Sequence, residues 1–162
     1  MSVNKFKPHV WVLPEDDANR QLANGFALHS ELDPTAIHLC PAAGGWLKAA
    51  GAVAAEHADG MRKYPLRHLV LLIDLDGQGD AREQLVRAVF PQDLVDRIYL
   101  LSARDDPEAL RSSQRQSFER LGELLAKDCA LDQPGLWDDE HLRHNKPELS
   151  RLIADVKPFL FP

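Results

Sequence analysis

The chain has 162 residues, a formal net charge of −6 at pH 7, 44% hydrophobic residues and 27% charged residues. This length suits a single domain with a substantial core, and the composition is ordinary for a soluble globular protein. The acidic balance provides no basic footprint for nucleic acid, and no apolar run approaches the length of a membrane span. The N-terminal residues lack a signal-peptide pattern, so we expect a cytoplasmic protein.

Short apolar blocks alternate along the chain with longer segments of helical periodicity. The predicted strands are residues 9–13, 36–40, 68–74 and 96–102. The first predicted helix has Asp17 as its N-cap, and the later ones cover residues 45–58, 81–90, 107–127 and 147–161. Residues 131–145 are polar and rich in turn formers.

Strands that alternate with helices of this length predict parallel strands joined by right-handed crossovers. We therefore expect an α/β fold, a three-layer sandwich with a central, mainly parallel, four-stranded and Rossmann-like sheet. The chain is predicted to form one domain, with an α/β core over residues 8–110 and a helical C-terminal extension over residues 111–162.

Acidic residues follow two of the predicted strands. The most hydrophobic strand ends in Asp74 and continues into Asp76, Gly77 and Gly79, and Glu15 follows the first strand. Ligands bind at the carboxyl edge of an open parallel sheet, and three carboxylates gathered there repel one another unless they are protonated or share a cation. Residues two apart on a strand face the same way, so Asp74 and Asp76 are predicted to hold Mg²⁺ or Mn²⁺ together with Glu15. An aspartate after a strand is also a common turn former, which is the alternative reading of this motif.

A glutamate after the first strand and D-x-D-x-x-G after the third, here Asp74 to Gly79, resemble the Toprim domain. That domain occurs in topoisomerases, bacterial primases, ribosomal RNA maturases and phage-defence nucleases. The resemblance covers residues 8–110 and implies metal-dependent phosphodiester chemistry on DNA or RNA. It implies that Glu15 is the general acid or base and a metal ligand, and that Asp74 and Asp76 hold Mg²⁺. Small members of the family often act with an ATPase or another nuclease subunit, and a homo-oligomer is a further alternative.

Two segments carry candidate groups for binding a substrate phosphate. Asn19 and Arg20 lie in the first turn of a helix whose N-terminus faces the proposed site. His144 and Lys146 belong to the polar segment that precedes the last helix. The alternative for both segments is an ordinary solvated helix start.

A second enzyme family shares part of this pattern. A strand that ends in D-x-D-G also resembles the first motif of the haloacid dehalogenase phosphatases, whose first aspartate is phosphorylated by the substrate. Asp74 would then be the nucleophile, Ser102 the next motif residue and Lys146 the charge-balancing lysine. A third alternative is a non-catalytic α/β subunit with a regulatory or scaffolding role. The two cysteines, Cys40 and Cys129, belong to no metal or redox motif and are predicted to be small buried thiols.

Overall fold

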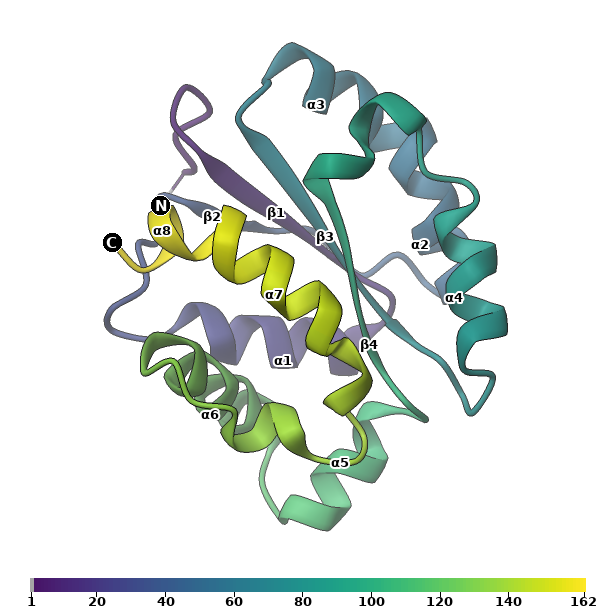
Figure 1. Ribbon diagram of the computed structural model, residues 1–162, viewed down its shortest axis with the longest axis vertical. Helices are drawn as coiled ribbons and strands as arrows, with labels where there is room; N and C mark the ends of the chain where they lie inside the picture. Colours follow the sequence, from purple (N-terminus) through teal and green to yellow (C-terminus); the bar gives the residue numbers. More distant parts are fainter. Residues whose placement is uncertain (1) are drawn as a thin grey trace.

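A computed structural model describes residues 2–162 and contains one four-stranded sheet in the order β2-β1-β3-β4 (Figure 1). The strands are β1 (His9–Pro14), β2 (Ile37–Leu39), β3 (Arg67–Asp74) and β4 (Ile98–Ala103). Every neighbouring pair is parallel. Helices flank the sheet, so the predicted three-layer α/β fold is confirmed. Among the helices of residues 2–162, none combines the length and the apolar character that a membrane crossing requires.

The helices lie close to where the periodicity predicts them, but the predicted helices over residues 45–58, 107–127 and 147–161 are each interrupted. They are α1 (Asp17–Ala27), α2 (Trp46–Ala52), α3 (Ala58–Lys63), α4 (Asp80–Arg87), α5 (Pro107–Gln114), α6 (Phe118–Ala130), α7 (Lys146–Asp155) and α8 (Lys157–Leu160). A π-helical turn at Val53–His57 joins α2 to α3. The single helix predicted over residues 107–127 is wrong, because Arg115 adopts a left-handed conformation and Ser117 caps a new helix by accepting the backbone N–H of Arg120.

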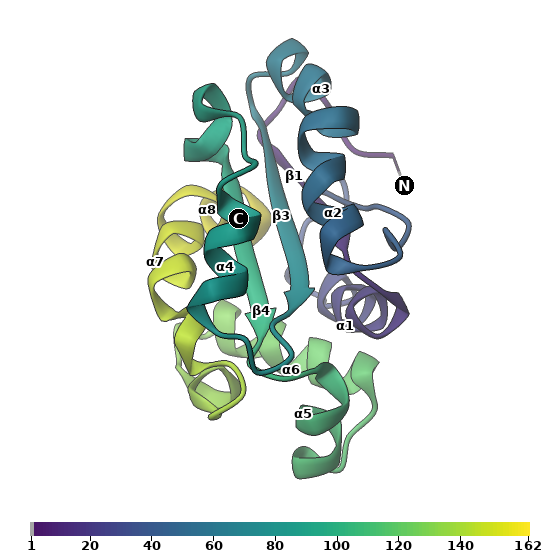
Figure 2. The ribbon, with the colours of Figure 1, turned by 90° about the vertical axis from the view of Figure 1, so that its right-hand side faces the viewer.

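The two faces of the sheet are covered by different parts of the chain. Leu69, Leu71 and Ile73 of β3 face α2, α3 and α4, and Val70 on the same strand faces α1, α7 and α8. Figure 2 shows that β3 and β4 run toward the end of the molecule where α5 lies. The C-terminal helices complete the core, because Val156 and Leu160 pack against the first and third strands. The predicted C-terminal extension therefore forms part of the same core as residues 8–110.

Helices α1 and α6 pack with their backbones in direct contact. A Cβ atom added to Gly122 of α6 would lie 2.0 Å from the carbonyl oxygen of Leu22. A Cβ added to Gly25 of α1 would lie 1.9 Å from the carbonyl oxygen of Glu119. Each glycine thus allows one helix to approach the main chain of the other, and any side chain at either position pushes the two helices apart.

We predict that Gly122→Ala lowers the free energy of unfolding by about 1–3 kcal/mol, because the new methyl group overlaps backbone that has no room to move. Gly51→Ala is the matched control, since Gly51 is exposed in α2 and its added Cβ meets nothing within 4 Å. That control is expected to raise the free energy of unfolding by about 0.5–1 kcal/mol through helix propensity. Urea denaturation measures both changes, and equal stabilisation by the two substitutions would contradict the close α1–α6 contact.

A partly buried histidine on β3 is expected to make the stability of the fold sensitive to acid. The imidazole of His68 on β3 stacks on the ring of Tyr99, and its centre lies 5.5 Å from that of the Phe159 ring. The Nδ1 atom of His68 shares a 3.1 Å hydrogen bond with the hydroxyl group of Tyr99. Burial, aided by the positive charge of Arg97, lowers the pKa of His68 from 6.5 to about 4. At a pH between these two pKa values, His68 is protonated in the unfolded chain and neutral in the folded chain. The free energy of unfolding therefore falls as the pH decreases through this range.

We predict that the His68 imidazole alone removes about 2 kcal/mol from the free energy of unfolding between about pH 7 and pH 5. His68→Gln cannot titrate, and it is expected to reduce the slope of stability against pH over this interval. Denaturant titrations of both proteins at several pH values measure that slope. An unchanged slope would show that His68 has an ordinary pKa in the folded protein.

Candidate metal centre at the carboxyl edge of the sheet

The strand order creates a topological switch point between β1 and β3. From β1 the chain crosses to β2 on one side, and from β3 it crosses to β4 on the other side. The loops that follow β1 and β3 therefore diverge, and ligands bind at such a switch point in open α/β sheets. Glu15 directly follows β1, and Asp74 is the last residue of β3, so both acids lie at this point.

A hydrogen bond between the two strand ends fixes Glu15 and Asp74 side by side. The Glu15 carboxylate oxygen Oε2 accepts the backbone N–H of Asp74 at 2.6 Å. The backbone N–H of Glu15 in turn donates to the carbonyl oxygen of Leu72 at 2.8 Å, which continues the β1–β3 ladder by one residue. The register of the sheet thus determines the position of Glu15, and its side chain is buried.

Asp16 and Asn19 complete the group from the first turn of α1. Asp16, rather than the predicted Asp17, is the N-cap of this helix, and its Oδ1 accepts the backbone N–H of Asn19 at 3.0 Å. The buried side-chain amide of Asn19 donates to Asp16 Oδ1 and to Asp74 Oδ1, both at 3.0 Å. Asn19 was predicted to bind a substrate phosphate, and in the structure its N–H groups are directed to the two acids.

The three acids form a compact negative site. One carboxylate oxygen each from Glu15, Asp16 and Asp74 lies within 4.8 Å of the other two. Burial, together with the neighbouring carboxylates of Glu15 and Asp16, raises the pKa of Asp74 to about 8 against the lowering effect of the hydrogen bond from Asn19. Burial also raises the pKa of Glu15. Within residues 2–162, no lysine, arginine or histidine forms an ion pair with these three carboxylates. Closely spaced oxygen ligands without a protein cation suit a hard divalent ion such as Mg²⁺ or Mn²⁺.

Asp76 lies outside this group, which corrects the geometry predicted from the D-x-D spacing. The strand ends at Asp74, and Asp76 has a positive φ of 47°, so the two side chains do not share a strand face. The half-exposed Asp76 carboxylate pairs with Arg82 at 2.5 Å. The same guanidinium donates to the backbone oxygen of Asp74 and stacks on Trp46. The third acid of the site is therefore Asp16, whose position next to Glu15 and three residues before Asn19 is the sequence signal that indicates it.

The loop after β3 turns as its glycines predict. Gly77 and Gly79 both have positive φ values, 73° and 54°, that side chains rarely adopt. The backbone N–H groups of Asp76 and Gly77 donate to the carbonyl oxygens of Asp105 and Arg104 in the loop after β4. This pairing joins the loop after β3 to the loop after β4.

The remaining predicted substrate-binding residues lie apart from the three acids. Arg20 is exposed and pairs with Asp17 at 2.8 Å. His144 shares a 2.8 Å hydrogen bond with Ser102 Oγ, and burial lowers its pKa. It lines a separate hollow of about 430 Å³ beside α4. Lys146 is exposed at the first residue of α7. None of these three side chains has a hydrogen bond to Glu15, Asp16 or Asp74.

No family model, no curated protein and no solved structure matches this chain. The Toprim resemblance rests on Glu15, Asp74, Asp76 and Gly79, and in the structure it is Glu15 and Asp74 that share one site with Asp16. Membership of that family accordingly stays a proposal.

Thiol chemistry is a poor alternative at neutral pH. Cys40 is buried and Cys129 is half-buried, and both are free thiols. Burial raises the pKa of each thiol to about 11, so both remain protonated and weakly nucleophilic. The prediction that they are small packing residues agrees with the buried position of Cys40.

The structure indicates Asp16 as the third metal ligand, whereas the D-x-D spacing predicts Asp76. Substituting each residue in turn distinguishes the two possibilities. We predict that Asp16→Asn lowers the affinity for Mn²⁺ about tenfold or more, because one charged ligand is lost. Asparagine caps helices as well as aspartate does, so α1 remains intact. Asp76→Asn is the matched control and is expected to change the affinity by less than about threefold. Electron paramagnetic resonance of free Mn²⁺ measures both affinities, and the reverse order would assign the third ligand to Asp76.

Proposed function

We propose that this protein is a Mg²⁺- or Mn²⁺-dependent hydrolase of phosphodiester bonds in DNA or RNA, with Toprim-like chemistry. The observation that supports this function is the group formed by Glu15, Asp16 and Asp74 at the switch point of the sheet. Its oxygen atoms offer the ligands that magnesium prefers. A divalent ion held there would neutralise the negative charge that develops on a phosphodiester during hydrolysis.

The protein residues around such an ion have distinct proposed roles. Glu15 is the candidate general acid or base, because burial raises its pKa toward the range in which a carboxyl group both accepts and releases a proton. Asn19 positions Asp74 by donating to its Oδ1 at 3.0 Å. Arg82 lies at the rim beside Asp76, where its guanidinium is close enough to the site to lower the pKa of Glu15. A cation at that rim favours the approach of a phosphate.

Because the chain has a net charge of −6, the proposal must account for how it binds nucleic acid. An acidic protein attracts nucleic acid weakly over its whole surface, so binding would depend on the metal, on local arginines, or on a partner such as an ATPase. In the last case, this chain would be the small catalytic subunit of a complex with that partner. Activity of the isolated chain is therefore best tested at low ionic strength, where electrostatic attraction is strongest.

A phosphatase mechanism that uses Asp74 as nucleophile is the competing enzyme hypothesis. One Asp74 oxygen is already engaged by Asn19, and the carboxylate is buried. Lys146, which would balance its charge, lies exposed at the start of α7. The exposed position of Lys146 favours the metal-dependent diesterase over the aspartyl-phosphate mechanism.

The proposal predicts that the purified chain nicks plasmid DNA or cleaves RNA in the presence of Mn²⁺ or Mg²⁺. Glu15→Gln is expected to reduce this rate by about 10²–10⁴-fold, the usual contribution of a general acid or base. Glu56→Gln, an exposed glutamate in the π-helical turn, is the matched control and should retain full activity. Agarose gels of plasmid and labelled RNA measure both variants.

A second assay separates the alternatives. Hydrolysis of p-nitrophenyl phosphate that survives Glu15→Gln and disappears with Asp74→Asn would support the phosphatase. A folded chain that binds Mn²⁺ and cleaves neither substrate, alone or with a candidate ATPase, would favour the non-catalytic role. Nuclease activity that is unchanged by Glu15→Gln would overturn the proposed function.

A further inference from the structure

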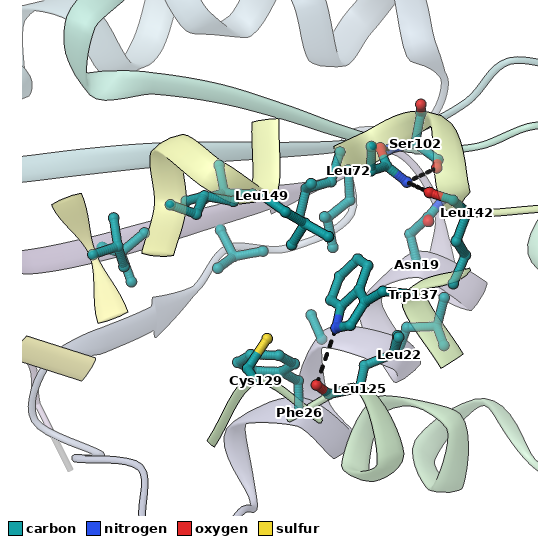
Figure 3. A pocket seen from close by; sticks show the side chains of 18 of the residues that line it. Asn19, Leu22, Phe26, Leu72, Ser102, Leu125, Cys129, Trp137, Leu142 and Leu149 are labelled. Carbon is teal, nitrogen blue, oxygen red and sulfur yellow. Dashed lines mark hydrogen bonds between the residues drawn. The ribbon is translucent and has the colours of Figure 1, made fainter. Parts of the chain in front are cut away.

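An apolar cavity of about 150 Å³ lies between the sheet and the helices of its second face. Figure 3 shows Leu72 and Leu149 on one side of the space and Leu22, Phe26 and Trp137 on the other. Leu72 in β3 is only partly buried, although β3 is a central strand with neighbours on both sides. The helices thus leave part of the sheet face uncovered inside the fold.

The side chains of Asn145 and Trp137 in the cavity wall already have hydrogen-bond partners. Asn145 Oδ1 accepts the backbone N–H of Ser102 at 2.9 Å, and its Nδ2 donates to the carbonyl oxygens of Ser102 and Leu142. The indole N–H of Trp137 donates to the carbonyl oxygen of Leu125 at 3.2 Å. These groups therefore offer little to a polar ligand or to water.

The charged group in the wall is also engaged elsewhere. Lys157 lines the cavity, and its ammonium group pairs with the exposed Asp132. No carboxylate belongs to the described lining. A charged ligand would be desolvated in this space without an opposite charge or a free donor, which is unfavourable.

We propose that this cavity is a binding site for a small, uncharged, apolar molecule of the size of one aromatic ring or a short branched alkyl group. A protein cavity of similar volume lined by leucine, isoleucine and phenylalanine stays dry and binds benzene. The wall here has the same chemistry, since leucines, Phe26 and Trp137 dominate it. The site is distinct from the acidic site in its ligand, because it recognises shape and apolar surface rather than charge.

Toluene, in metal-free buffer, is the probe that tests this site. Methyl resonances of the lining leucines are expected to shift saturably in ¹H–¹³C spectra, and the melting temperature should rise with toluene concentration because the ligand binds only the folded protein. Ala23→Leu places three extra carbons in the cavity from α1, and it is expected to weaken toluene binding at least about tenfold. Ala154→Leu, on the exposed side of α7, is the matched control and should bind as the wild type does.

Leu149→Ala is the complementary variant, and it keeps the test informative if Ala23→Leu does not fold. It enlarges the cavity, so the variant is expected to bind naphthalene while the wild type does not. Absence of saturable shifts with toluene in the wild type would overturn the proposal, as would equal binding by wild type and Ala23→Leu. Binding of decanoate in place of toluene would also overturn it, in favour of a site for a chain with a charged head group. These measurements use no metal and no nucleic acid, so their outcome is independent of the proposed hydrolase function.

Discussion

Mutual repulsion among three clustered carboxylates, two of them buried, is the constraint around which the carboxyl edge of this sheet is arranged. The hydrogen bond from the Asp74 backbone N–H to Glu15 holds two of these acids together at the ends of adjacent strands. Asn19 then donates one N–H each to Asp16 and Asp74, which relieves part of the repulsion without neutralising it. A pKa of about 8 for Asp74 means that the remaining charge is removed either by a proton or by a cation. Under the proposed function, proton binding and metal binding would therefore compete at this site around neutral pH.

The sheet and the acids at its edge could be predicted from sequence because their signals are local. A buried strand is a short apolar run, and the carboxyl ends of parallel strands always share one edge. The predictions that were wrong depended on long-range contacts or on residues of nearly equal propensity. Asp16 and Asp17 are equally good caps by composition, and only the contact of Asn19 with Asp74 selects Asp16. The break at Arg115 has no glycine or proline to indicate it, and it depends on how α5 and α6 pack against α1.

Helix α1 connects the two sites. Its first turn carries Asp16 and Asn19 of the acidic group, and Leu22, Ala23 and Phe26 in the next turns line the apolar cavity. Asn19 itself belongs to both, since it lines the cavity and donates to Asp74. A small displacement of this helix changes the cavity and the separation of the acids together. The backbone contact with α6 through its glycines opposes such a displacement, because neither helix can move closer to the other.

Both sites reduce the stability that the fold would otherwise have. Buried carboxylates are unfavourable without a cation, and an unfilled apolar space forfeits the contacts of the side chains that line it. Substitutions that neutralise a buried acid or fill a cavity are commonly stabilising, because natural proteins are rarely at their stability optimum. In this chain one substitution would suffice for each, at Asp74 or at Ala23. Helix α1 carries residues of both features, so a ligand at either proposed site would act on the same element of the fold.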